Sequence, residues 1–118
     1  MQLPVSDFPQ WRDAIKAHAD GEAGASLPVV LDVREPWELQ TASVKEDGFR
    51  LVRIPMREVP ARLVELDPAQ PVACLCHHGM RSLQVANYLV QNGFKEVVNL
   101  QGGIDAWSSD VDASVPRY

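Results

Sequence analysis

The sequence predicts an α/β fold, a single domain with a central parallel β-sheet flanked by helices on both faces. Short apolar runs alternate along the chain with segments of helical periodicity, which is the pattern of βα units. The run at 29–33, Val-Val-Leu-Asp-Val, is typical of a strand buried on both faces. With 118 residues, 46% of them hydrophobic, the chain suffices for one domain over 1–118 and has no room for a second full domain.

Four strands are expected, each a short apolar run bounded by polar, Gly or Pro residues: 29–33, 51–54, 72–75 and 97–100. Helical spacing lies between most of these runs, so we expect the strands to be parallel. In open parallel sheets, ligands collect beyond the carboxyl ends of the strands. The segment that directly follows 72–75 is therefore the first candidate for a functional site.

Helices are expected where apolar residues recur at i, i+3, i+4 and i+7: 8–18, 57–66 and 82–92. Helix 82–92 has the most regular pattern and ends at Asn92-Gly93, a left-handed stop signal. Shorter helices are expected from Pro36 and over 104–107. Residues 20–26 form a polar loop within the domain, and the tail at 108–118 either wraps the domain or frays.

The charge balance excludes some classes of partner. Eleven Lys and Arg against 16 Asp and Glu give a net charge of −5, which disfavours binding to nucleic acid or anionic lipid. The first residues show no signal-peptide pattern, and no apolar run approaches the ~18 residues that span a membrane. We therefore expect a cytoplasmic protein whose partners include neither nucleic acid nor a membrane.

The segment 76–82, Cys-His-His-Gly-Met-Arg-Ser, carries the candidate chemistry. A loop that opens a helix directs backbone N–H groups and the positive end of the helix dipole at one point, which favours an anion. There Cys76 would be held as a reactive thiolate, aided by a cation such as Arg81. Gly79 would permit a positive φ or let the backbone approach the ligand closely. His77 and His78 could act as acid or base, but we favour a role for their amides in the cradle and their side chains at its rim.

Cys74 and a metal site are the competing interpretations of this region. Cys74 lies within the apolar strand and is expected to be core. Residues two apart on a strand point to the same face, which suits a disulfide poorly, so at least one thiol is expected to be free. Adjacent His77 and His78 rarely converge on one ion, and no CxxC or HxxxH pair is present. No metal site is predicted.

Three segments in this order together resemble the rhodanese (sulfurtransferase) family: Leu-Asp-Val-Arg-Glu at 31–35, the loop at 76–82, and Asn-Leu-Gln-Gly-Gly-Ile-Asp-Ala-Trp at 99–107. The resemblance spans about 28–107. It implies that Cys76 accepts a sulfane sulfur as a persulfide and passes it to a thiophilic acceptor, with no metal or organic cofactor. The implied substrate-binding loop is His77, His78, Gly79, Met80 and Arg81, supported by Asp32, Arg34 and Ser82.

The resemblance also frames the partners. The donor would be thiosulfate, as a small sulfur-containing anion, or a protein persulfide, and the acceptor a sulfur-carrier protein or a thioredoxin-like thiol. If Arg81 turns away from the pocket as an ion-pair partner, thiosulfate would bind poorly and a protein persulfide would be the donor. The segment 48–55 departs from the family's small, glycine-containing turn, so one wall of the pocket is expected to differ.

Two other functions remain open from the sequence. One is a non-catalytic or regulatory rhodanese-like module in which Cys76 senses persulfide or peroxide. The other is a cysteine-dependent phosphatase, some of which share this fold. Those phosphatases carry a Cys-x5-Arg loop, whereas Cys76 and Arg81 enclose four residues. The shorter loop makes a smaller ring of amides, which suits a sulfur atom better than a phosphate.

Overall fold

The computed structural model of the chain describes residues 2–19 and 27–117, so the loop expected at 20–26 lies outside the described residues. In the described part, five parallel strands form one sheet in the order β1-β5-β4-β2-β3. Their bounds are β1 Gln2–Pro4, β2 Val29–Asp32, β3 Arg50–Arg53, β4 Val72–Leu75 and β5 Val97–Gln101. Central β2 and β4 are buried at every position. The expected α/β class with a parallel sheet is confirmed.

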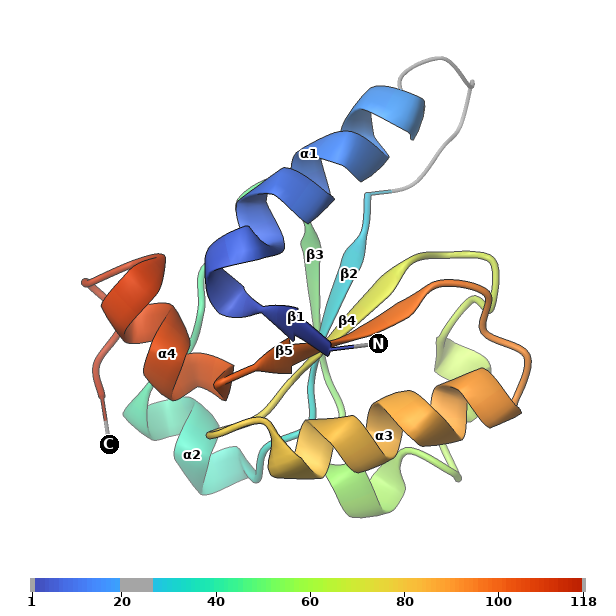
Figure 1. Cartoon of the computed structure of the whole chain (residues 1–118). Coiled ribbons are helices and arrows are strands. Elements are labelled where there is room, and N and C mark those ends of the chain that lie inside the picture. The colour runs from blue at the N-terminus through green and yellow to red at the C-terminus, as the bar shows by residue number, and fades with distance from the viewer. Residues whose placement is uncertain (1, 20–26, 118) are drawn as a thin grey trace.

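Helices cover both faces of this sheet (Figure 1). The α-helices are α1 Phe8–Ala19, α2 Pro36–Thr41, α3 Met80–Gln91 and α4 Gly103–Asp110. Alternate strand residues face opposite sides: one set packs with Val85 and Leu89 of α3, and the other packs with Phe8 of α1 and Trp107 of α4. None of the described helices is both long and apolar enough to cross a bilayer.

The first strand, β1, is not among the expected strands. It pairs with β5 at the sheet edge, with Leu3 opposite Leu100, and it is followed by a 3-10 turn, η1 Val5–Asp7. A run of three residues is too short to show alternation. Pro4 also reads as a strand breaker, although proline is tolerated on an edge strand.

The prediction of a helix over 57–66 is wrong. The segment holds two single 3-10 turns, η2 Met56–Glu58 and η3 Leu63–Glu65, separated by hydrogen-bonded turns. Pro60 lies between them and has no N–H to continue a helical ladder. Apolar Val59 and Leu66 are buried as the spacing suggests, so the pattern identified core residues and not a helix.

The tail packs against the domain as far as residue 117. Helix α4 extends beyond the expected 104–107, and the Ser108 hydroxyl donates to the carbonyl of buried Val115. Arg117 pairs with Asp105 at 3.1 Å.

In the atypical 48–55 segment, Phe49 is buried and packs edge-on against Phe8, with ring centroids 5.4 Å apart. The long side chain that replaces a small turn residue there contributes to the core.

Candidate active site

The candidate loop lies at the carboxyl end of β4 and leads into α3 (Figure 1). Helix α3 begins at Met80, two residues before the expected start, and its N-cap is Gly79, with φ +101°. The positive φ expected of Gly79 is confirmed. Cys76, the first residue after β4, is 1% exposed, so the protein covers it almost completely.

The first residues of α4 hydrogen-bond to the backbone of the loop. The N–H of Ile104 donates to the Cys76 carbonyl at 2.8 Å, and the N–H of Asp105 donates to the His77 carbonyl at 3.1 Å. Gly103 permits this approach, since a Cβ atom there would lie 2.4 Å from the His77 oxygen and 2.5 Å from the Cys76 oxygen. The turn expected at Gly102-Gly103 therefore also fixes the position of the Cys76 backbone.

Two polar groups contact the Cys76 sulfur. The N–H of Gly79 donates to Sγ at 3.1 Å, and the Ser82 hydroxyl lies 3.2 Å from Sγ. Ser82 is fully buried. The expected cradle therefore includes at least one amide directed at the sulfur, together with the hydroxyl of the supporting serine.

Arg81 turns toward α2. Its guanidinium donates to both carboxylate oxygens of Glu38, at 2.6 and 2.8 Å. The Glu38 side chain is 4% exposed and that of Arg81 is 33% exposed. Glu38 also accepts the N–H of Glu35 at 3.2 Å, which completes a capping box at the start of α2. The sequence left the direction of the Arg81 side chain open, and the structure shows it as an ion-pair partner of Glu38.

Asp32 and Arg34 supply one another with the partner that buried charges need. Arg34 donates through Nε to Asp32 Oδ1 at 2.9 Å and through Nη2 to Oδ2 at 2.7 Å, and both side chains are fully buried. A further bond runs from Arg34 to the carbonyl of Glu38 at 3.2 Å. This pair therefore links the end of β2 to α2. Helix α2 in turn binds Arg81 through Glu38.

His77, His78 and Met80 lie at the outer side of the loop. The two imidazole rings stack with centroids 3.9 Å apart and planes 25° apart. With Asp105 they offer three ligand atoms within 4.8 Å of one another. Stacked rings direct their in-plane lone pairs almost in parallel, and the Arg117 hydrogen bond, aided by the two histidines, lowers the pKa of Asp105. The group fits a divalent cation only after the rings rotate apart and Arg117 releases the carboxylate.

Cys74 is enclosed in the core on the α3 side of the sheet. Burial, and secondarily the negative charge of Cys76, raises the pKa of the Cys74 thiol to about 12. Both cysteines are free thiols. The expectation of a core role for Cys74 is confirmed, since its thiol stays protonated and inert near neutral pH.

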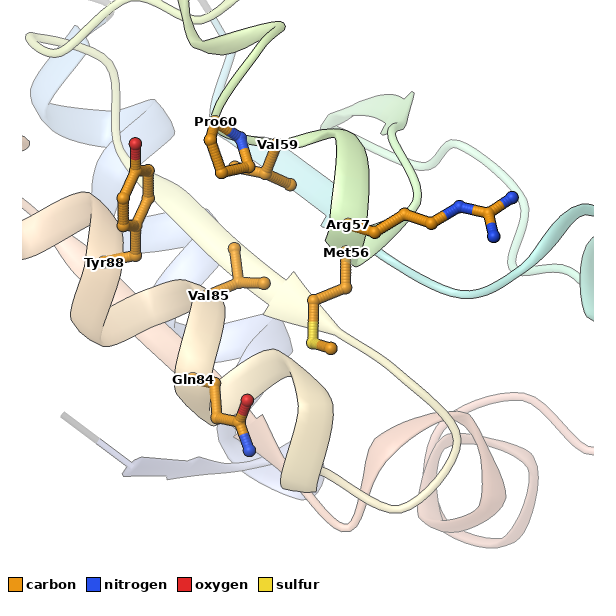
Figure 2. A pocket seen from close by; sticks show the side chains of 7 residues that line it. All are labelled: Met56, Arg57, Val59, Pro60, Gln84, Val85 and Tyr88. Carbon is orange, nitrogen blue, oxygen red and sulfur yellow. The ribbon is translucent and has the colours of Figure 1, made fainter.

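A shallow groove of about 220 Å³ lies beside α3 (Figure 2). Met56, Val59 and Pro60 line one side of it, and Gln84, Val85 and Tyr88 of α3 line the other. No residue of the 76–82 loop lines this groove. The candidate chemistry therefore lies elsewhere, at the buried sulfur.

Three residues of the site are given no role at the sulfur by the sequence analysis. Glu38 binds Arg81, Asn99 binds Ser82, and Gly103 lets α4 approach the loop. The capping-box spacing of Glu35 and Glu38 was the available signal for the first. The paired glycines after β5 were the signal for the third. Asn99, a polar residue within an apolar strand, gave a signal of the same kind as Asp32.

Comparison with known proteins places the chain in a family. The rhodanese-like domain family matches residues 13–110. Rhodanese-like/PpiC domain-containing protein 12 of Arabidopsis thaliana is 43% identical over 93 residues, which cover 75% of this chain and 30% of that protein. A sulfurtransferase of Allochromatium vinosum is 34% identical over 80 residues, or 68% and 71% of the two chains. Thiosulfate sulfurtransferase GlpE of Vibrio cholerae is 37% identical over 78 residues, or 66% and 70%.

Solved structures agree with this assignment. A rhodanese-related protein from Thermoplasma volcanium matches with a TM-score of 0.71 and 27% identity, covering 93% of this chain and 92% of that one. A rhodanese-like domain protein from Staphylococcus aureus, 23% identical with a TM-score of 0.71 and coverage of 100% and 99%, shares the fold. The chain belongs to the rhodanese-like domain family. Its named relatives support sulfurtransferase activity at the level of that family.

Proposed function

We propose that the chain accepts a sulfane sulfur on Cys76 as a persulfide and passes it to a thiophilic acceptor. The observation that carries the proposal is the Cys76 sulfur beyond the end of β4, with the Gly79 N–H directed at it from 3.1 Å. An amide donor stabilises a thiolate more than a neutral thiol. The start of α3 adds the positive end of a helix dipole at the same point.

The chemistry balances without an external oxidant or reductant. The Cys76 thiolate attacks the sulfane sulfur of the donor, a new S–S bond forms, and the donor's S–S bond breaks with both electrons on its leaving group. That group is sulfite for thiosulfate and a thiolate for a persulfide. An acceptor thiolate or cyanide then attacks the outer sulfur and releases the Cys76 thiolate. Neither step calls for a Lewis acid or an electron carrier, so the proposal includes no metal or organic cofactor.

We infer a persulfide, carried by a protein, as the preferred donor. A small dianion such as thiosulfate binds best where a cation faces it, and the Arg81 guanidinium is engaged by Glu38 at 2.6 and 2.8 Å. The residues that precede Glu38 and Arg81 in the sequence, Trp37 and Met80, are 63% and 72% exposed. Exposed apolar side chains of this size favour contact with a protein surface.

We propose that the acceptor is also a protein, either a sulfur-carrier protein or a thioredoxin-like thiol. Cys76 is 1% exposed, so it is reached by a thin sulfur-bearing group and not by a bulky one. The negative net charge supports the exclusion of nucleic acid and anionic membranes. A cytoplasmic location completes the proposal, because reducing compartments keep free thiols reduced.

Competing donors test this proposal. We would measure kcat/KM with cyanide as acceptor for thiosulfate and for a persulfidated cysteine peptide, in wild type, Cys76→Ser and Cys74→Ser. We expect Cys76-dependent transfer from both donors, a higher kcat/KM for the peptide, and an unchanged rate in Cys74→Ser. Higher kcat/KM for thiosulfate would refute the donor assignment, and a rate that persists in Cys76→Ser would refute the function.

Phosphatase activity is disfavoured by two observations. Four residues separate Cys76 from Arg81, and the Arg81 guanidinium donates to both carboxylate oxygens of Glu38. Cys76-dependent turnover of an aryl phosphate would overturn this argument. A sensing role would appear as a persulfide on Cys76 that an added thiol fails to discharge.

A further inference from the structure

We propose that Asn99 is a positioning residue that controls the reactivity of Cys76 by holding the hydroxyl group of Ser82. The three residues form a buried chain from β5 through α3 to the sulfur: Asn99 to Ser82, and Ser82 to Cys76. The inference deepens the proposed function and rests on it only for the role of Cys76 as nucleophile.

The orientation of the Asn99 amide follows from its neighbours. Its Nδ2 lies 3.0 Å from the carbonyl oxygen of Gly79 and 2.7 Å from Oε1 of Gln2. A backbone carbonyl can only accept a hydrogen bond, so the donor end of the amide must face Gly79. Oδ1 of Asn99 therefore faces Ser82 and can act only as an acceptor.

The single proton of the Ser82 hydroxyl is thereby assigned. It donates to Asn99 Oδ1, since that oxygen has no proton to offer. The Ser82 oxygen then presents a lone pair to Cys76 Sγ at 3.2 Å. A neutral thiol suits this arrangement, because its S–H can donate to the Ser82 oxygen. In this arrangement the S–H of Cys76 has an acceptor, and the Ser82 proton is held by Asn99.

Ionisation reverses the requirement. When the Cys76 proton leaves to a base in solvent, the sulfur becomes an acceptor and faces the lone pair of Ser82. The hydroxyl can rotate and donate to the thiolate, but Asn99 Oδ1, in a side chain 1% exposed, then loses its donor, which is costly for a buried acceptor. The Gly79 N–H donates to the sulfur in both states. That amide binds the thiolate more strongly than the thiol, and the competition for the Ser82 proton is the separate contribution that depends on Asn99.

The persulfide form makes the same demand. Once a sulfur is bonded to Sγ, that atom has no proton, so the Ser82 hydroxyl must again turn toward it to avoid facing lone pairs. When the thiolate released by transfer takes a proton from solvent, the hydroxyl returns to Asn99. Asn99 Oδ1 is thus the acceptor to which the Ser82 proton returns in each cycle, and its strength sets how readily Cys76 ionises.

The test is the pH profile of Cys76 alkylation by iodoacetamide, resolved by peptide mass spectrometry. In Asn99→Ala the Ser82 proton has no competing acceptor, and we expect the midpoint to fall by about one pH unit, a roughly tenfold gain in rate below the midpoint. In Asn99→Asp a charged acceptor holds the proton more strongly, and we expect the midpoint to rise. In a Ser82→Ala background, Asn99→Ala should produce no shift.

Controls separate this role from a structural one. Asn92→Ala removes an exposed asparagine that binds only its own helix, through the Tyr88 carbonyl at 2.8 Å, and should leave the midpoint unchanged. Asn99→Asp keeps the side-chain shape and serves if Asn99→Ala does not fold; because a carboxylate also opposes ionisation of a nearby thiol through space, its shift is compared with and without Ser82→Ala. An unmoved midpoint in the folded Asn99 variants, or an equal shift with and without Ser82, would overturn the inference. Alkylation needs no sulfur donor, so failure of sulfur transfer is a separate result.

Discussion

The ion pair between Glu38 and Arg81 provides the sharpest prediction about the donor. We consider Glu38→Gln, which keeps the size of the side chain and removes its charge. In the wild-type protein the Arg81 guanidinium donates to both carboxylate oxygens of Glu38, at 2.6 and 2.8 Å. The amide of glutamine can accept only one of these bonds, and its NH2 group would face the other donor. We therefore expect Arg81 to be released from Glu38 and to become available to an anion near Cys76.

The cost in stability follows from the burial of the two partners. Breaking a fully buried pair costs about 3–5 kcal/mol. Glu38 is 4% exposed, but Arg81 is 33% exposed and stays hydrated when released, so we expect a loss of about 2 kcal/mol. For a domain of this size that is a fall in Tm of roughly 8 °C. The released cation can meet a dianion near the sulfur, so the KM for thiosulfate should fall about fivefold, equivalent to ~1 kcal/mol.

Urea unfolding and initial rates with thiosulfate and cyanide measure both effects. Glu65→Gln is the matched control, because Arg62 binds Glu65 with the same two-pronged geometry, at 2.8 and 3.0 Å, on the exposed surface. We expect its stability and KM to stay within error of wild type. A KM for thiosulfate that stays unchanged or rises in Glu38→Gln would refute the idea that Glu38 withholds Arg81 from the donor.

Two further predictions concern the backbone and the second cysteine. Since burial raises the pKa of Cys74 from 9.0 to about 12, only the unfolded chain ionises this thiol between those values, so stability should fall by about 1.4 kcal/mol per pH unit above pH 9. Unfolding by urea at increasing pH should show that component in wild type and not in Cys74→Ala. Gly103→Ala would place a Cβ 2.4 Å from a loop oxygen, and we expect it to abolish transfer. Gly93→Ala, with φ +89° and open space around it, should lose stability and keep activity. Equal activities in the two glycine variants would contradict this account.

Much of the fold follows from short-range patterns. The strands predicted at 29–33 and 72–75 and the helix predicted at 82–92 match β2, β4 and α3 to within two residues, because their apolar spacing is regular and their ends carry Gly or Pro signals. The 57–66 segment misled the prediction because Val59 and Leu66 are truly buried while Pro60 interrupts the ladder. Apolar spacing reports which side chains are in the core, whereas helix formation also requires an unbroken series of donors.

The site divides in the same way. The loop from Cys76 to Ser82 was predicted because its residues are consecutive. The direction of Arg81 was left open because its partner, Glu38, lies 43 positions away in the chain. Asn99 is 17 positions from Ser82 and was not assigned a role. Partners brought together by the sheet order are set by tertiary packing, which local spacing does not encode.

The central claim is that Cys76 carries the transferred sulfur, and intact mass after incubation with a persulfide donor tests it most directly. We predict that wild type and Cys74→Ser gain one sulfur atom and lose it when an acceptor thiol is added, while Cys76→Ser gains none. A sulfur atom gained by Cys76→Ser and discharged to the same thiol would contradict the account.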